Sequence, residues 1–207
     1  VAAGITAGVV QRGAGVAAAA AAGSISSSGW FNTNGVATTL ADAIANNEYY
    51  EFTLPIQNCY RADITTVQIV LRSSNTGPNT ATLRSSIDGF TADLGTATVT
   101  AASVLNTFNV NINGNTGTIT FRLYGYGNAV SGSPGTGGTM RIGTSVVAAD
   151  NDLIINGSTI QTTVNSITFA NISACNNNGT NADPSDDYFT ADITVNYTNP
   201  PASGNLT

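Results

Sequence analysis

Short runs of alternating apolar and polar residues recur along this 207-residue chain, and they constrain its fold more than any other feature. Tyr50, Phe52 and Leu54 occupy every second position of one run, and the same period of two returns in residues 108–113 and 119–123. Successive side chains of a β-strand point to opposite faces, so each run predicts a strand with one buried face.

Turn signals separate these runs and extend the β prediction to the whole chain. They include Asn-Gly and Asp-Gly pairs and a Gly-rich segment at 131–138. Thirty threonines, 24 asparagines and 22 glycines favour strands and turns over helices. We therefore expect an all-β fold, a jelly-roll-like β-sandwich. The only helix that the sequence predicts is one or two turns over residues 38–45.

The pattern changes after Asn156 and Gly157, which predicts two modules. Residues 1–157 hold the jelly-roll-like β-sandwich. Residues 158–207 show strands near 159–172 and 188–198 around a polar segment, 175–187. An immunoglobulin-like sandwich needs about 100 residues and seven strands. We therefore expect residues 158–207 to be an incomplete immunoglobulin-like module, either truncated or completed by a neighbouring chain.

The ionisable side chains are few, and this argues against several functions. The chain has no histidine and no lysine, and its six cations are all arginines. It thus lacks the groups from which most enzymes build acid-base and nucleophilic sites near pH 7, which predicts a non-catalytic protein. The sequence has no basic stripe that could bind nucleic acid. It also has no apolar run of 18 residues, so membrane insertion is not predicted. With so few titratable groups, we also expect stability to be insensitive to pH near neutrality.

The first residue, Val1, and the two cysteines suggest export. A chain without an initial methionine is expected if an export signal is removed or if it is excised from a longer precursor. Cys59 and Cys175 are compatible with an oxidising compartment, where a disulfide between them would contribute about 4 to 5 kcal/mol in the chain-entropy model. The sequence leaves their connectivity open.

Several phrases resemble a β module of large surface proteins that bacteria export through the type IX secretion system. Those in the first module are RGAG (12–15), SGW (28–30), EYYEFT (48–53), TLRSSIDGF (82–90) and TFRLYGY (120–126). Residues 175–195, which contain DPSDDYFTAD (183–192), resemble the opening of an immunoglobulin-like repeat. The resemblance implies tandem β modules in a secreted, adhesin-like cell-surface protein, and it implies no shared catalytic residues. In such repeats the partner of the opening cysteine lies later in the same repeat, which weakens the Cys59–Cys175 pairing.

Three groups of residues are candidates for chemistry. Asp183, Asp186 and Asp187 offer the hard oxygen ligands that calcium prefers, but the same residues also suit a solvated loop. Calcium is the only cofactor that the sequence suggests. Glu48 and Glu51 could supply a glycosidase carboxylate pair together with Asp88, although Glu48 and Glu51 should point to opposite faces of a strand.

Arg122, Tyr124 and Tyr126 should share one strand face, where they could form an exposed platform for a sugar ring. The alternative, which we favour, is that they cover the outside of a sheet without binding anything.

These patterns favour a structural or adhesive extracellular module of a surface protein or filament. Its partners would be other copies or adjacent repeats, paired through strand edges. The alternative is a carbohydrate-binding jelly roll, appended to a secreted hydrolase, that binds surface glycan.

Overall fold

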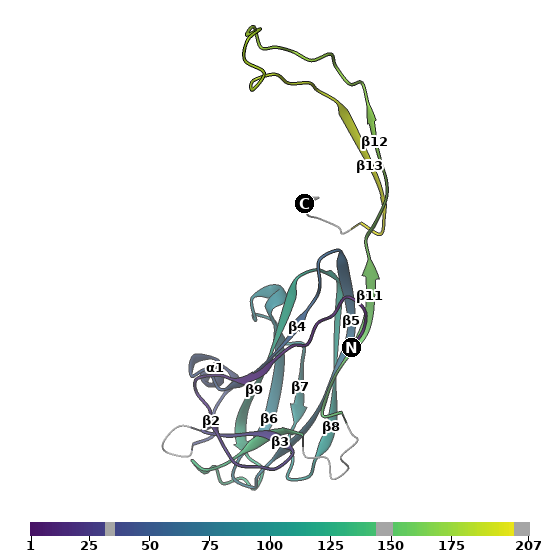
Figure 1. The fold of residues 1–207 in the computed structure, drawn as a ribbon. Coiled ribbons are helices and arrows are strands. Elements are labelled where there is room, and N and C mark those ends of the chain that lie inside the picture. The colour runs from purple at the N-terminus through teal and green to yellow at the C-terminus, as the bar shows by residue number, and fades with distance from the viewer. Residues whose placement is uncertain (32–35, 144–150, 201–207) are drawn as a thin grey trace. The chain divides into compact units, whose positions relative to one another are not determined.

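The computed structural model of this chain describes residues 1–31, 36–143 and 151–200. It is 53% strand and 5% helix, which confirms the all-β prediction. The chain divides into two compact units, Val1–Thr159 and Ile160–Thr207. Unit 1 is a sandwich of two antiparallel sheets, and unit 2 is a single hairpin in the part of it that is described (Figure 1). Each unit is described by itself below.

The first sheet of unit 1 carries much of the core. Its strands lie in the order β1-β4-β9-β6-β7. Their bounds are β1, Val10–Arg12; β4, Tyr49–Pro55; β9, Thr118–Ala129; β6, Pro78–Ser85; and β7, Gly95–Thr98.

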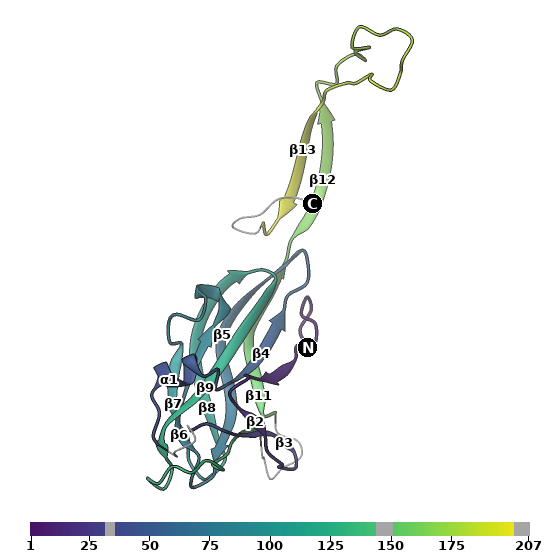
Figure 2. The same cartoon turned by 90° about the vertical axis from the view of Figure 1, so that its left-hand side faces the viewer.

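The second sheet faces the first and is built around its longest strand, β5 (Tyr60–Ser73). β8 (Val104–Asn115) pairs with one side of β5. The order β11-β5-β10-β3-β2 completes the sheet. The remaining bounds are β11, Leu153–Gln161; β10, Met140–Gly143; β3, Ser24–Ser28; and β2, Ala17–Ala18. Figure 2 shows β5 and β8 in the layer behind β4 and β9.

The core lies between the two sheets, on the faces that the alternation predicts. Phe52 of β4 stacks on Phe121 of β9, with 5.3 Å between ring centroids. Ile69 of β5 is fully buried in the same cluster. Trp30 is also fully buried, and its indole nitrogen donates to the Ser27 carbonyl at 2.7 Å. A buried indole N–H needs such a partner, because an unpaired donor would cost free energy.

One short helix, α1 (Leu40–Ala45), forms where the sequence predicts it. Thr39 is its N-cap: the Thr39 hydroxyl accepts from the Asp42 amide, and the Asp42 carboxylate accepts from the Thr39 amide at 2.8 Å. This reciprocal capping box satisfies donors that a six-residue helix would otherwise leave unpaired. The helix buries Ala43 and packs against β9.

Unit 2 contains the strands β12 (Thr163–Ala170) and β13 (Asp192–Thr198), which pair only with each other. Ile167 lies opposite Val195, and Phe169 lies opposite Ile193. A register shift between Val164 and Ser166 keeps Val164 opposite Tyr197. No third strand of the described chain adds to this sheet.

Candidate interaction surfaces

The hairpin of unit 2 has one apolar face and one polar face. Because cross-strand partners point to the same face, Val164, Ile167, Phe169, Ile193, Val195 and Tyr197 share one side. Thr168, Thr194, Ser166 and Asn196 lie on the other side. We call the first set the apolar hairpin face.

The apolar hairpin face is open to solvent. The side chains of Phe169, Ile193 and Ile167 are 61%, 60% and 56% exposed, whereas Phe121 in unit 1 is 0% exposed. A lone two-stranded hairpin is marginally stable in water, and three or more strands with a covered apolar face are needed for independent stability. Unit 2 therefore presents a surface that is suited to burial against another sheet.

The sandwich of unit 1 also has free strand edges. Among the described strands, β8 pairs with β5 alone, which leaves the other side of its 12 residues free. β2, from the alanine-rich segment, is the edge strand of the second sheet, but it is only two residues long. A long open edge leaves unpaired backbone donors and acceptors, which can pair with another strand.

The predicted aromatic platform on β9, Arg122, Tyr124 and Tyr126, is largely covered by side chains of neighbouring residues. Tyr124 is only 2% exposed, so the expectation that it offers an open ring face is wrong. Its ring packs edge-on against Tyr49, at 5.4 Å between centroids. The Arg122 guanidinium lies 4.5 Å from the Tyr49 ring centroid and 4.1 Å from that of Phe90.

Further bonds hold this cluster in place. Arg122 donates to Glu51 at 2.8 Å, and Glu51 also accepts from Gln11 at 2.6 Å. The Tyr126 hydroxyl bonds with that of Thr82 at 2.9 Å. Arg122, Tyr124 and Tyr126 thus share one face as predicted, and the polar groups of Arg122 and Tyr126 are hydrogen-bonded within the sheet. Sugar binding by these three residues stays a prediction.

The other predicted carboxylates are also engaged locally. Asp88 accepts from the backbone amides of Ala92 and Thr91, and these bonds lower the pKa of its carboxyl. Asp88 ends a short 3-10 helix, η1 (Ser86–Asp88), and Gly89 follows with φ of 71°. Glu48 is 3% exposed, and burial raises its pKa to about 7. Glu48, Glu51 and Asp88 therefore each have a separate local environment.

The acidic loop of unit 2 bonds mainly to itself. Asp183 accepts from the Ser185 side chain at 2.6 Å and from the Ser185 amide at 3.0 Å, and these bonds lower its pKa. Both Asp186 oxygens accept from the Thr180 hydroxyl, at 2.7 and 2.9 Å. Among the described residues, no group of three or more carboxylate, thiol or imidazole side chains is placed to hold a metal ion. Calcium binding by Asp183, Asp186 and Asp187 stays a prediction.

The two cysteines lie in different units. Cys59 belongs to unit 1 and Cys175 to unit 2, and both thiols are exposed and unpaired. Cys59 adopts a left-handed backbone, with φ of 64°. A disulfide between the two residues stays a prediction.

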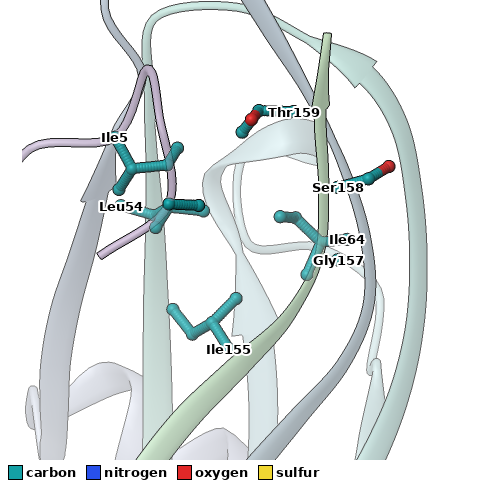
Figure 3. Close-up of a pocket in the computed structure, with 8 residues that line it drawn as sticks. Ile5, Leu54, Ile64, Ile155, Gly157, Ser158 and Thr159 are labelled. Atoms are coloured by element: carbon teal, nitrogen blue, oxygen red, sulfur yellow. The ribbon is translucent and has the colours of Figure 1, made fainter.

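A small hollow in unit 1 lies between the N-terminal segment and β11 (Figure 3). Its volume is about 50 Å³, whereas ligand pockets usually measure about 300 to 1,000 Å³. Its lining residues are Ala2, Ile5, Leu54, Ile64, Ile155, Gly157, Ser158 and Thr159. It is a packing gap rather than a site for a sugar ring.

The structure brings together one pair of arginines that the sequence does not predict to be neighbours. Arg72 of β5 lies directly opposite Arg141 of β10. The two residues are 69 positions apart in the chain, and only the strand pairing brings them together, so no local pattern marks them.

Comparisons of this chain with protein-family models, with curated proteins and with solved structures found no match. No helix in residues 1–31, 36–143 and 151–200 is long and apolar enough to cross a membrane. The strand content and sheet topology define the fold class as an all-β sandwich with an appended hairpin.

Proposed function

We propose that this chain is a non-catalytic structural or adhesive module of an extracellular surface protein or filament. It assembles with other copies, or with adjacent repeats, through β-strand edges and through the apolar hairpin face. The single observation that carries the proposal is the exposure of that face, because folding leaves large apolar side chains in water unless a partner covers them.

Secretion and cell-surface location belong to the same proposal. Their support is the resemblance of the sequence to type IX exported surface proteins, together with two cysteines that are compatible with an oxidising compartment. In this proposal the first unit is a rigid, cored block. The second unit supplies two strands and a face that a neighbour completes by adding its own sheet.

The experiment compares the full 207-residue chain with two double variants by sedimentation velocity over a range of concentrations. Ile167→Thr with Phe169→Thr removes apolar area and places at both positions threonine, a β-branched residue that favours strands. Thr168→Ser with Thr194→Ser is the matched control on the polar face. At about 0.5 M sodium chloride, which screens exposed charges, we expect the unmodified chain and the control to associate and the apolar-face variant to stay monomeric.

Hydrogen exchange of the assembled protein adds a second measurement. Amides of β12 and β13 should gain protection on association if neighbouring strands complete the hairpin. An unmodified chain that remains monomeric at every concentration, with these amides unprotected, would overturn the proposal.

A further inference from the structure

Two arginines face each other across two paired strands of the second sheet. Arg141 of β10 is the direct partner of Arg72 of β5. Met140 and Ile142, which flank Arg141, point into the core, so Arg141 points to the outer face of the sheet. Directly opposed side chains have Cβ atoms about 5 Å apart, and like charges at this distance repel each other.

No anion in the described part of the chain compensates this pair. The Nε atoms of Arg72 and Arg141 are buried and have no hydrogen-bond partner. Neither guanidinium forms an ion pair with a described carboxylate, whereas Arg84 and Arg122 do. Asp152 occupies a neighbouring place on the sheet, where its carbonyl accepts from the Val70 amide, but its carboxylate pairs with neither arginine.

Two adjacent guanidiniums without a described partner are suited to an oxyanion, which would contact their terminal nitrogens because the Nε atoms are buried. Each guanidinium offers a planar set of N–H donors that fits a carboxylate in a two-point contact. An anion placed between them would also remove their mutual repulsion. The chemical class of the ligand is therefore a carboxylate or a similar oxyanion on an approaching surface.

Unit 2 carries the complementary charge. Its charged side chains are Asp183, Asp186, Asp187 and Asp192, and it contains no arginine or lysine. Asp187 is exposed, and none of the described residues bonds to its carboxylate. A second copy of this chain thus presents an acidic loop that lacks any cation of its own.

We infer that the Arg72–Arg141 pair binds the carboxylates of the acidic loop, residues 183–187, of a second copy. The contact is heterologous, because different surfaces of the two copies meet, and repeated contacts of this kind build closed rings or open rows of copies. This inference identifies a second pair of contacting surfaces for the assembly proposed above, and it therefore rests on the proposed function. It involves neither the apolar hairpin face nor a strand edge.

The salt dependence of association distinguishes this charged contact from the contact through the apolar hairpin face. Attraction between exposed charges is screened as ionic strength rises, because the Debye length falls to about 3 Å at 1 M salt. Burial of apolar area is not weakened in that way. The test is therefore made in the Ile167→Thr, Phe169→Thr background, in which association through the apolar hairpin face is removed.

In that background, sedimentation at low salt should show association that disappears at about 0.5 M sodium chloride. Arg72→Gln with Arg141→Gln should weaken it by at least about tenfold. Asp186→Asn with Asp187→Asn should weaken it similarly. Arg84→Gln is the matched control, since it removes one arginine that already has a partner, Asp93. It should leave the association unchanged.

A charge-reversal pair identifies the partner. Chains with Arg72→Glu and Arg141→Glu, and chains with Asp186→Arg and Asp187→Arg, should each fail to associate alone and should associate when mixed. Circular dichroism of each variant confirms that the fold is retained.

Equal association of the arginine variant and its parent would overturn the inference. So would a mixture that stays monomeric, or arginine-dependent binding of polygalacturonate with no effect of the aspartate variants. The last result would assign the site to an acidic polysaccharide. Failure of the apolar-face experiment alone would leave these outcomes unaffected, so the two proposals fail separately.

Discussion

The two units use the same strand pattern but place their apolar side chains in different environments. In unit 1, Phe52 and Phe121 meet between two sheets and are almost fully buried. In unit 2, Phe169 and Ile193 lie on one face of a single sheet and are about 60% exposed. Alternation therefore specifies which face of a strand is apolar, but it does not supply the second layer that buries that face.

The largest expected difference between the units comes from one phenylalanine in each. Phe121→Ala should lower the free energy of unfolding of unit 1 by about 3 to 5 kcal/mol, because it leaves a cavity in a packed core. Phe169→Ala should change it by less than about 0.5 kcal/mol, since that side chain is exposed. Denaturant unfolding followed by fluorescence reports on unit 1, because the only tryptophan, Trp30, is buried there.

Equal losses from both substitutions would contradict the comparison. They would mean that the Phe169 side chain contributes to the folded state of unit 1. Leu123→Ala, at another fully buried site of β9, serves as a second core variant and should fall in the range of about 2 to 5 kcal/mol.

The next effect is a pH dependence in unit 1 that arises from Glu48. Burial raises the pKa of Glu48 from 4.5 to about 7. Between these two pH values the folded state keeps a proton that the unfolded state has lost. The free energy of unfolding should therefore fall as pH rises from about 4.5 to 7, by up to about 3 kcal/mol, and should then level off.

Glu48→Gln tests this dependence by removing the titration while keeping the shape of the side chain. Its free energy of unfolding should stay constant over the same pH range. Urea unfolding at pH 5, 6 and 7 measures the slope. An unmodified chain with no slope would show that the Glu48 carboxylate has its ordinary pKa in the folded state.

The smallest effect concerns the cap of α1. Thr39→Ala removes the hydroxyl that accepts from the Asp42 amide, and should cost about 1 kcal/mol. Thr39→Ser keeps the hydroxyl and should cost less. Thr168→Ala, on the polar face of the hairpin, is the matching change in unit 2 and should leave the Trp30 transition in place. A Thr39→Ala variant as stable as the parent would show that the cap contributes little.

The candidate sites show where local patterns are insufficient. The shared face of Arg122, Tyr124 and Tyr126 follows from the period of two, but the burial of Tyr124 depends on Tyr49 in another strand. Glu48 illustrates the same limit. A chain with few titratable groups is predicted to be insensitive to pH near neutrality, yet one buried carboxyl shifts its pKa into that range.

By itself, the sequence determined the all-β class, the faces of the main strands, the position of α1 and the change of pattern near residue 157. These features depend on the period of side-chain orientation and on capping and turn residues, which act over a few positions. Only the tertiary structure decided that Tyr124 is covered, that Arg72 meets Arg141 and that the apolar hairpin face lies open. Each depends on which distant strands pair and stack, and the period of two is the same whichever strand becomes the neighbour.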